Sequence, residues 1–302
     1  MLSGDGPYKA NTLAKGIIIP SITVFKQDED QTLDEHRTGD HVDWLISNGA
    51  DAIVPAGSSG EFPALRMDEA KQIFDIAISV AKKRVPVYPA VGRYGTRDTI
   101  ELTRHAEKAG AAGVMVIVPY YMKPDRHAIM EHFRAVRRNT DLPIILYNNP
   151  ATTGVELAHD DIVSLFDEGV VNGVKSSQGE VEPTIKLTSA RAKLCSYYGH
   201  DIQPTMALNE GAYGWFSLFP NVFPRLAKQL QSGTSHEQKD VWMRLAPCVN
   251  FVWGGTAHPV AAVKAALEIQ GRWVGVPRLP LQPLPQYVYQ RLETIVREAG
   301  AA

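Results

Sequence analysis

A lysine closes an apolar segment, VVNGVKSS at residues 170–177, that has the composition of a buried strand. Lysine is seldom fully buried without a partner, so Lys175 requires an explanation. An apolar interior disfavours the charged form of an amine and lowers its pKa. The neutral amine can then attack a ketone and form a Schiff base. Lys175 is therefore the first candidate catalytic residue, although a single lysine at a strand end is usually exposed and inert.

Imine chemistry also requires proton transfer and a site for the substrate carboxylate. Tyr147 opens the segment YNNPATTG, and its phenol could act as general acid and base. Ser58 and Ser59 lie in GSSGEF at residues 57–62, where hydroxyl and backbone N–H groups of a glycine-flanked turn could bind a carboxylate. Taken alone, such a turn or tyrosine is usually structural. The hypothesis depends on these residues ending neighbouring strands.

The candidates follow apolar segments that alternate with amphipathic helical patterns. Strands are expected at residues 16–25, 50–57, 85–92, 113–120, 143–150, 170–177, 192–199 and 212–218. Helices are expected between them at residues 33–49, 67–84, 96–110, 125–140, 159–169 and 181–190. This alternation predicts a parallel sheet, because each crossover between parallel strands requires a helix. Eight strands, with no GxGxxG after the first, favour a closed (β/α)8 TIM barrel over an open doubly wound sheet.

The predicted barrel places the candidates together and leaves a second region after it. We expect a catalytic barrel domain at residues 1–220 and a C-terminal helical region at residues 221–302. The C-terminal region contains a proline-rich linker at 274–285, before its last helical pattern. The helical patterns of this region lie at residues 221–232, 236–250, 258–271 and 285–299. Active sites of (β/α)8 barrels lie at the carboxyl ends of the strands. The lysine, the tyrosine and the serine pair all fall there.

Composition excludes several other classes of protein. The 302 residues are 44% hydrophobic and 21% charged, with a net charge of −2, and they contain no basic block that would bind nucleic acid or a membrane surface. No apolar run approaches the ~18 residues that a membrane-spanning helix needs. Cys195 and Cys248 provide no disulfide framework, and the first residues lack the apolar core of a signal peptide. We therefore expect a cytoplasmic protein.

The sequence disfavours a metal site and a phosphate-binding site. A metal site would need converging His and carboxylate ligands, yet the nine histidines fall mostly in helical segments and no HExxH occurs. His200 with Asp201 is the only His/Asp pair at a predicted strand end, and His200 is more plausible as a substrate contact than as a metal ligand. The loop FPNVFPR after the last strand lacks a glycine-rich phosphate cradle. An unphosphorylated 2-oxo acid is thus favoured.

Four segments occur together in one order: GSSGE at 57–61, PYYMKP at 119–124, YNNPATTG at 147–154 and GVKSS at 173–177. In this combination the chain resembles the dihydrodipicolinate synthase / N-acetylneuraminate lyase family of Schiff-base-forming (β/α)8 enzymes. The resemblance runs over nearly the whole length, from GIIIPSITVF to the C-terminal VKAALEIQGRWVGVPRLPL. It implies an enzyme without metal or organic cofactor, built as a homotetramer from a dimer of dimers.

The resemblance also implies roles for individual residues. Lys175 would form the imine with pyruvate or a related 2-oxo acid, and Tyr147 would transfer protons with the help of Ser58. Ser59 would bind the substrate carboxylate, since the two serines stand where the family usually has a threonine pair. Tyr121 would reach into the neighbouring subunit's site. The remaining expected substrate-binding residues are Gly57, Thr152, Phe216 and His200.

Two departures from the family pattern bear on the substrate. Thr152 stands where the true synthases carry an arginine for the aldehyde's carboxylate, and a neutral hydroxyl cannot make that bidentate contact. Ser176 follows the lysine where many members have an acidic residue. Open alternatives are a 2-keto-3-deoxy-aldonate aldolase or dehydratase, a hydroxyproline-pathway deaminase and a true dihydrodipicolinate synthase. A non-catalytic barrel that binds a 2-oxo acid or sugar acid is disfavoured, because a binder needs no amine beside a phenol.

Overall fold

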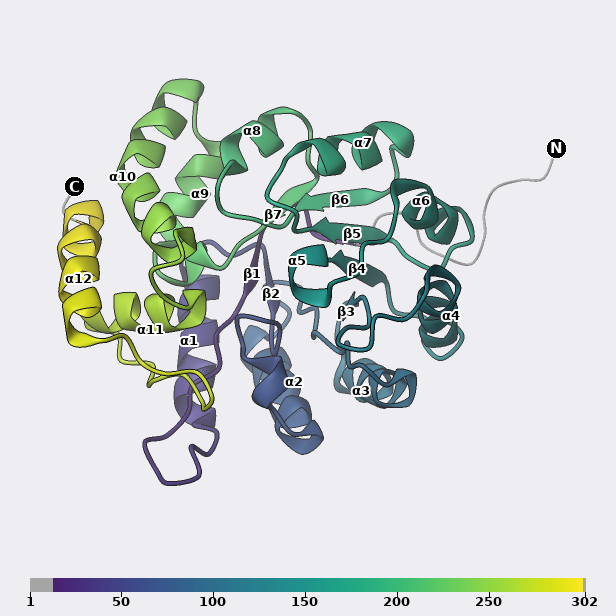
Figure 1. Cartoon of the computed structure of the whole chain (residues 1–302), viewed down its shortest axis with the longest axis horizontal. Helices are drawn as coiled ribbons and strands as arrows, with labels where there is room; N and C mark the ends of the chain where they lie inside the picture. Colours follow the sequence, from purple (N-terminus) through teal and green to yellow (C-terminus); the bar gives the residue numbers. More distant parts are fainter. Residues whose placement is uncertain (1–12, 301–302) are drawn as a thin grey trace.

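Parallel strands form a barrel that is surrounded by helices (Figure 1). The computed structural model describes residues 13–300. Its sheet has the order β2-β1-β7-β6-β5-β4-β3, and every pairing is parallel. The strands are β1 Gly16–Pro20, β2 Ala52–Val54, β3 Val114–Ile117, β4 Ile144–Asn148, β5 Gly173–Ser176, β6 Cys195–Tyr198 and β7 Gly214–Phe216.

The third of the eight predicted strands, residues 85–92, is not a regular strand. It fills the place between β2 and β3, where Val87 bridges to β2 and Ala90 bridges to β3. The carbonyls of Pro86 and Pro89 accept hydrogen bonds from these two strands, at 3.1 and 2.9 Å. Other residues of the segment donate back to both strands, but the two prolines have no N–H, so the ladder remains incomplete. The predicted TIM-barrel architecture is confirmed, with this segment closing the barrel.

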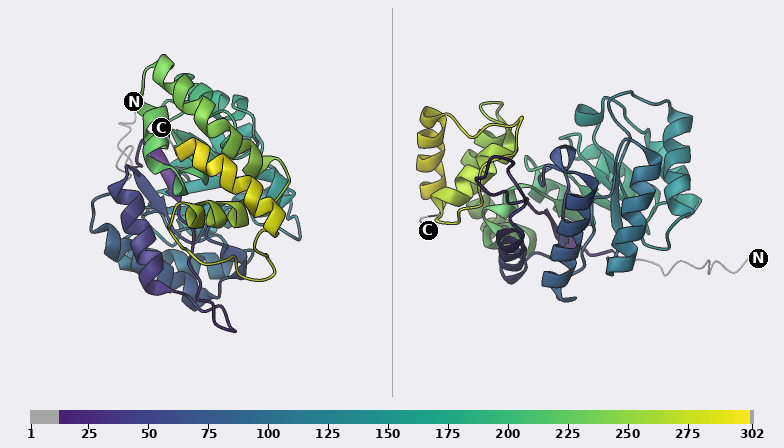
Figure 2. Two further views of the ribbon diagram at one scale, coloured as in Figure 1. Left: turned by 90° about the vertical axis from the view of Figure 1, so that its left-hand side faces the viewer. Right: turned by 90° about the horizontal axis from the view of Figure 1, so that it is seen from below.

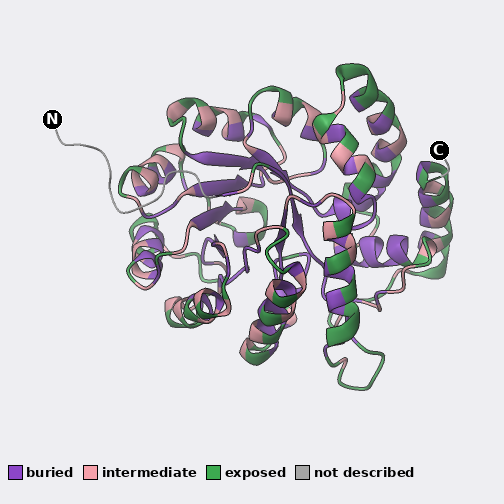
Figure 3. Cartoon of the chain, turned by 180° about the vertical axis from the view of Figure 1, so that it is seen from behind, coloured by how far each residue is buried: buried purple, intermediate pink, exposed green. Residues whose placement is uncertain are grey.

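Amphipathic helices cover the outside of the barrel. Their bounds are α1 Glu35–Ser47, α2 Met67–Ala81, α3 Thr96–Ala109, α4 Arg126–Arg137, α6 His159–Asp167 and α7 Glu182–Ala190, each within a predicted range. Helix α4 shows how the sequence specifies such a helix. Asp125 caps its N-terminus, and the side chains of Ile129, Phe133 and Val136 form its buried face. Figure 3 shows the result, with buried strands inside and exposed helix faces outside.

Short helical turns escaped the sequence analysis. They are η1 Phe62–Ala64, α5 Pro150–Thr153, α8 Pro204–Asn209 and η2 Phe219–Asn221. Each has a proline at its first or second position, which suits a helix start but leaves too few residues for a visible period. Two of these turns, η1 and α5, follow the segments that carry the candidate serines and Tyr147, so they shape the rim of the site.

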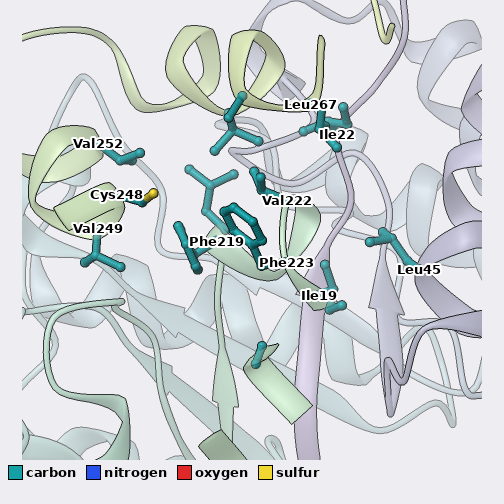
Figure 4. Close-up of a cluster of buried hydrophobic side chains, with 14 of the residues drawn as sticks. Ile19, Ile22, Leu45, Phe219, Val222, Phe223, Cys248, Val249, Val252 and Leu267 are labelled. Carbon is teal, nitrogen blue, oxygen red and sulfur yellow. The ribbon is translucent and has the colours of Figure 1, made fainter. Parts of the chain in front are cut away.

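The C-terminal helices gather at one side of the barrel (Figure 2). They are α9 Pro224–Ser232, α10 Ser235–Trp253, α11 Pro259–Ile269 and α12 Gln286–Gly300. Helix α9 packs against β1, and one hydrophobic cluster joins Ile19 and Leu45 of the barrel to Val249 and Leu267 of the C-terminal helices (Figure 4). The division of the chain at residue 220 stays a prediction. Among the described residues, no helix has the length and apolar character needed to cross a membrane.

A buried ion pair fastens α11 to the turn that carries the candidate serines. Lys264 Nζ lies 2.7 Å from a carboxylate oxygen of Glu61, and both side chains are 1% exposed. The backbone N–H of Arg278 donates to Glu61 at 2.8 Å, and the guanidinium of Arg278 makes a second ion pair with Glu69, also at 2.8 Å. The predicted linker at 274–285, which contains no helix or strand, is thereby fixed to the rim of the barrel.

Replacing Lys264 with Met should therefore destabilise the protein. It leaves the Glu61 carboxylate buried without a cation, a change that typically costs about 3–5 kcal/mol. The midpoint of urea unfolding should fall, and adding Glu61→Gln to Lys264→Met should recover much of the loss. Lys186→Met is the control, because its ion pair with Glu182 lies on the surface. A midpoint for Lys264→Met equal to that of the control would contradict this role.

Candidate active site

Lys175 lies in β5 and is 6% exposed. Its neighbours across the sheet are Tyr147 in β4 and Tyr197 in β6. Lys175 Nζ lies 3.9 Å from the centroid of the Tyr147 ring and 5.4 Å from that of the Phe216 ring. Aromatic faces attract a cation, so these two rings accommodate the nitrogen without a carboxylate.

Gly199 makes room for the lysine. A Cβ atom at this position would lie 2.8 Å from Lys175 Cγ and 2.2 Å from Ser177 Oγ, both closer than real contacts allow. The Ser177 hydroxyl instead donates to the Gly199 carbonyl at 2.6 Å. The glycine before His200 is therefore required by close packing around the lysine stem.

Tyr147 is buried beside the lysine, and its hydroxyl accepts a hydrogen bond from Asn149 Nδ2 at 2.8 Å. Burial by itself raises the pKa of the phenol, but the nearby Lys175 ammonium lowers it. Hydrogen bonding to Asn149, Ser177 and Ser58 lowers it further, so the net pKa of Tyr147 lies below the ordinary value. This phenol is thus suited to giving and regaining a proton beside the amine.

A cavity of about 820 Å³ opens above the lysine at the carboxyl ends of the strands. The sequence-predicted residues that line it are Ser58, Ser59, Tyr147, Thr152, Lys175, His200 and Phe216. Gly57 lines a small neighbouring cavity together with Ser58 and Tyr147. The structure therefore brings together residues from five strand ends that lie far apart in the sequence.

The serine turn is held in a defined shape. The backbone N–H of Glu61 donates to the Ser58 carbonyl at 3.1 Å, and Thr23 Oγ1 donates to the Gly60 carbonyl at 2.8 Å. Ala56 and Glu61, at the two ends of the turn, have φ angles of 52° and 60°. Such left-handed conformations cost energy in residues other than glycine and persist only where the surroundings impose them.

Tyr121 lies outside this cavity. Its side chain is 84% exposed and its φ angle is 68°, whereas the preceding residue, Tyr120, lines the cavity. The structure thus does not bring Tyr121 to the lysine of its own chain. The expected contact with a neighbouring subunit stays a prediction.

Several lining residues were not predicted from the sequence. Trp253 ends α10, His258 begins α11, and Leu279 to Leu281 lie in the predicted linker. Nothing in their local sequence distinguishes them from ordinary helix ends and linker residues. Asn149 belongs to the motif YNNPATTG, and its place two residues after Tyr147 in that motif is a signal in the sequence for its role.

Asp201 is the fully buried member of the His200–Asp201 pair, which the sequence analysis discussed as a metal site. Its carboxylate accepts hydrogen bonds from Ser217 Oγ and, at 2.9 Å, from Trp253 Nε1. Burial raises the pKa of Asp201 to about 6, against the opposing effect of these two donors. Among residues 13–300 there is no group of three or more His, Cys, Asp or Glu side chains that could hold a metal ion.

A barrel with an aromatic-lined lysine beside a phenol is the arrangement expected of a lysine-dependent lyase, and comparison with known proteins specifies the family. The sequence model of the dihydrodipicolinate synthetase family matches residues 13–299. The 4-hydroxy-tetrahydrodipicolinate synthase of Geotalea uraniireducens is 31% identical over 95% of this chain and 99% of its own length. The enzyme of that name from Acidiphilium cryptum is 33% identical over 90% and 94%.

Solved structures agree with the sequence relatives. Dihydrodipicolinate synthase from Aquifex aeolicus superimposes with a TM-score of 0.89 at 28% identity, covering 95% of this chain and 98% of the other. The enzyme from Thermotoga maritima gives 0.88 at 28% identity, covering 95% and 99%. The chain belongs to the dihydrodipicolinate synthetase family. The resemblance and the prediction of a class I, aldolase-type lyase are confirmed at this level.

The pairing of Tyr147 with Lys175 can be tested by titration. Lys175→Met removes the positive charge that lowers the pKa of Tyr147, so the phenol should ionise at higher pH in the variant. The measurement is a spectrophotometric titration of tyrosinate absorbance, with Tyr147→Phe subtracted to isolate this residue. Burial raises the pKa of Tyr88 to about 12, so that phenol does not interfere. Coincident Tyr147 curves for wild type and Lys175→Met would show that the two groups are not coupled.

Proposed function

We propose that this chain is a lyase that holds pyruvate or a related 2-oxo acid as an imine on Lys175. The observation that carries the proposal is the position of Lys175 Nζ, 3.9 Å from the centre of the Tyr147 ring and open to the cavity. Among the described residues no carboxylate lies within ion-pair distance of this nitrogen. An amine that is buried, unpaired with an acid and facing a cavity is suited to nucleophilic attack.

The proposed reaction begins when the Lys175 nitrogen adds to the carbonyl carbon of the 2-oxo acid. Tyr147 relays one proton from the nitrogen to the carbonyl oxygen and then supplies a second one, so that the oxygen leaves as water when the iminium forms. Loss of a proton from the neighbouring carbon then produces an enamine, which forms a carbon–carbon bond to an aldehyde. In the reverse direction the iminium of the longer acid takes the electron pair of that bond, which releases the aldehyde and leaves the enamine. Ser58, near the phenol, would return protons to Tyr147 in this sequence.

The serine turn would bind the carboxylate of the 2-oxo acid. Ser59 is buried and lines the cavity, and the backbone N–H groups of the turn would add further donors. Donors fixed in advance stabilise an anion at little reorganisation cost. Gly57 and the ring of Phe216 would complete the walls around the bound three-carbon unit.

The finer reaction type remains a choice among related chemistries. The names of the relatives favour a 4-hydroxy-tetrahydrodipicolinate synthase. Thr152, on α5 at the cavity wall, does not supply the charged contact that an anionic aldehyde would use. This observation favours a 2-keto-3-deoxy-aldonate aldolase or dehydratase, or a deaminase of the hydroxyproline type. A non-catalytic barrel that binds a sugar acid is the alternative outside enzymes. The cytoplasmic location stays a prediction, with Cys195 and Cys248 both buried and not joined in a disulfide.

Borohydride reduction in the presence of pyruvate tests the imine directly. A reduced pyruvyl adduct should form on Lys175, located by intact mass and peptide mapping, and Lys175→Ala should form none. Tyr147→Phe is the matched control, because it keeps the amine. Its kcat should fall about 10²- to 10⁴-fold, since the phenol that transfers protons is lost. An adduct only with larger 2-oxo acids would indicate dehydratase or deaminase specificity. No adduct with any 2-oxo acid would leave the binding-protein alternative.

We also propose that the active protein is a homo-oligomer in which Tyr121 completes the neighbouring subunit's site. The support is its 84% exposure at the rim of a barrel whose own cavity it does not reach. A tyrosine so exposed, in a left-handed backbone conformation, is favoured where it serves a contact.

Complementation between two inactive variants tests this proposal. Tyr121→Phe and Lys175→Ala should each have low activity, but their co-expression should restore up to about one quarter of wild-type activity. In a two-fold symmetric pair, one site of each mixed dimer regains both residues. Mixed oligomers can be isolated with two different affinity tags. Purified mixed oligomers with no more activity than their parents would place Tyr121 outside the site.

A further inference from the structure

The wall of the cavity formed by His200, Trp253 and Asp201 has no role in the proposed imine chemistry. His200 and Asp201 follow β6, whereas Trp253 comes from the end of α10. All three line the same cavity as Lys175. We call these three residues the tail wall, after the part of a substrate that we expect them to face, beyond the carbons held at the lysine.

The orientation of His200 in the tail wall is fixed from three sides. Its Nδ1 accepts the backbone N–H of Asp201 at 2.9 Å, and its ring centroid lies 4.4 Å from that of Trp253. Its backbone carbonyl accepts from Trp215 Nε1 at 2.8 Å. Because Nδ1 is an acceptor, the proton of the neutral imidazole is on Nε2.

The surroundings of His200 favour its neutral form. Burial, and to a smaller extent the charge of Lys175, lowers the pKa of its imidazole. No described residue forms a hydrogen bond with His200 Nε2. The histidine therefore presents one fixed, uncharged N–H donor at the cavity wall.

Asp201 holds the other members of the tail wall in place. Its backbone N–H orients His200, and its carboxylate accepts from Trp253 Nε1 at 2.9 Å and from Ser217 Oγ. These donors occupy both carboxylate oxygens, so Asp201 is a positioning residue. The hydrogen-bonding group of the tail wall that remains for a ligand is the His200 donor.

The charges around the cavity decide which ligands suit this donor. Lys175 and Arg278 are the only Lys or Arg side chains that line it in the described structure. The Lys175 nitrogen is consumed by the imine. The Arg278 guanidinium is bound by the Glu69 carboxylate and by the carbonyls of Gln31 and Ala64. A second carboxylate on the substrate would thus find no free cation and would lie in a cavity that Asp201 and Glu61 also line.

We propose that His200 is a specificity-determining residue that donates a hydrogen bond to an oxygen on an uncharged, hydroxylated substrate tail. The inference rests on the proposed imine function, because the lysine fixes where the tail begins. It selects hydroxylated 2-oxo acids over those with an apolar or a carboxylated tail. A site built to hydrogen-bond a substrate oxygen strongly rejects analogues that lack this oxygen. An apolar wall discriminates less strongly against an analogue that carries an additional hydroxyl.

Imine trapping with 2-oxo acids of equal chain length tests the inference without assuming a reaction type. The probes are 2-keto-3-deoxy-gluconate, 2-oxohexanoate and 2-oxoadipate, whose tails are hydroxylated, apolar and anionic. The quantity measured is the concentration that gives half-maximal borohydride adduct, read by intact mass. A pyruvyl adduct formed from the hydroxylated acid counts as binding followed by cleavage. Wild type should be half-saturated at the lowest concentration by the hydroxylated acid.

Two substitutions assign the preference to the histidine. His200→Phe keeps a ring against Trp253 but lacks the N–H, and the ratio of half-saturating concentrations for the apolar and hydroxylated acids should fall about tenfold. His200→Gln, which retains a side-chain N–H, should restore most of the ratio. His36→Phe is the surface control and should leave it unchanged, since His36 is exposed on α1. Thermal unfolding of each variant checks that it folds.

The outcomes separate the inference from the function on which it rests. Pyruvate trapping on Lys175 together with a wild-type preference for 2-oxoadipate, or an unchanged ratio in His200→Phe, would overturn the role of His200 and leave the imine function standing. Failure of pyruvate and of every longer acid to form an adduct with wild type would overturn both. Loss of the ratio in His200→Phe with recovery in His200→Gln would support the inference.

Discussion

The in-register pairing of β4 with β5 is the constraint around which the site is arranged. Tyr147 lies opposite Lys175 in that pairing, and paired residues of neighbouring strands point to the same face of a sheet. A register shift of one residue would turn one of the two side chains to the outer, helix-covered face. The barrel interior therefore receives amine and phenol together. The Ser58 turn, Phe216 and Gly199 complete the surroundings from other strand ends.

Two buried lysines show opposite solutions to the cost of burying an amine. Lys264 is fully enclosed and is paired with Glu61, which keeps it charged and makes it a structural fastener. Lys175 instead lies against the rings of Tyr147 and Phe216, with no carboxylate at ion-pair distance among the described residues. A carboxylate partner would hold the proton on the nitrogen. Aromatic faces stabilise the cation less strongly and leave the nitrogen accessible for covalent chemistry.

Sequence reasoning could find the strand ends because parallel barrels place them at one rim by topology alone. Lys175, Tyr147, Ser59 and Thr152 were located in this way. The same reasoning could not find Trp253, because periodicity identifies a helix without saying which part of the barrel its end will reach. It also misjudged residues 85–92, whose apolar composition suits a strand but whose two prolines cannot donate to the ladder.

The C-terminal region contacts the rim of the cavity at two places. Lys264 and Arg278 fasten the turn that carries Ser59, and Trp253 at the end of the preceding helix belongs to the tail wall. Under the proposed function, the carboxylate end and the tail end of a substrate would thus both be positioned from outside the barrel strands. The strands fix the Lys175 nitrogen and the Tyr147 phenol. We therefore expect substitutions in the C-terminal region to alter substrate choice while the amine and the phenol stay in place.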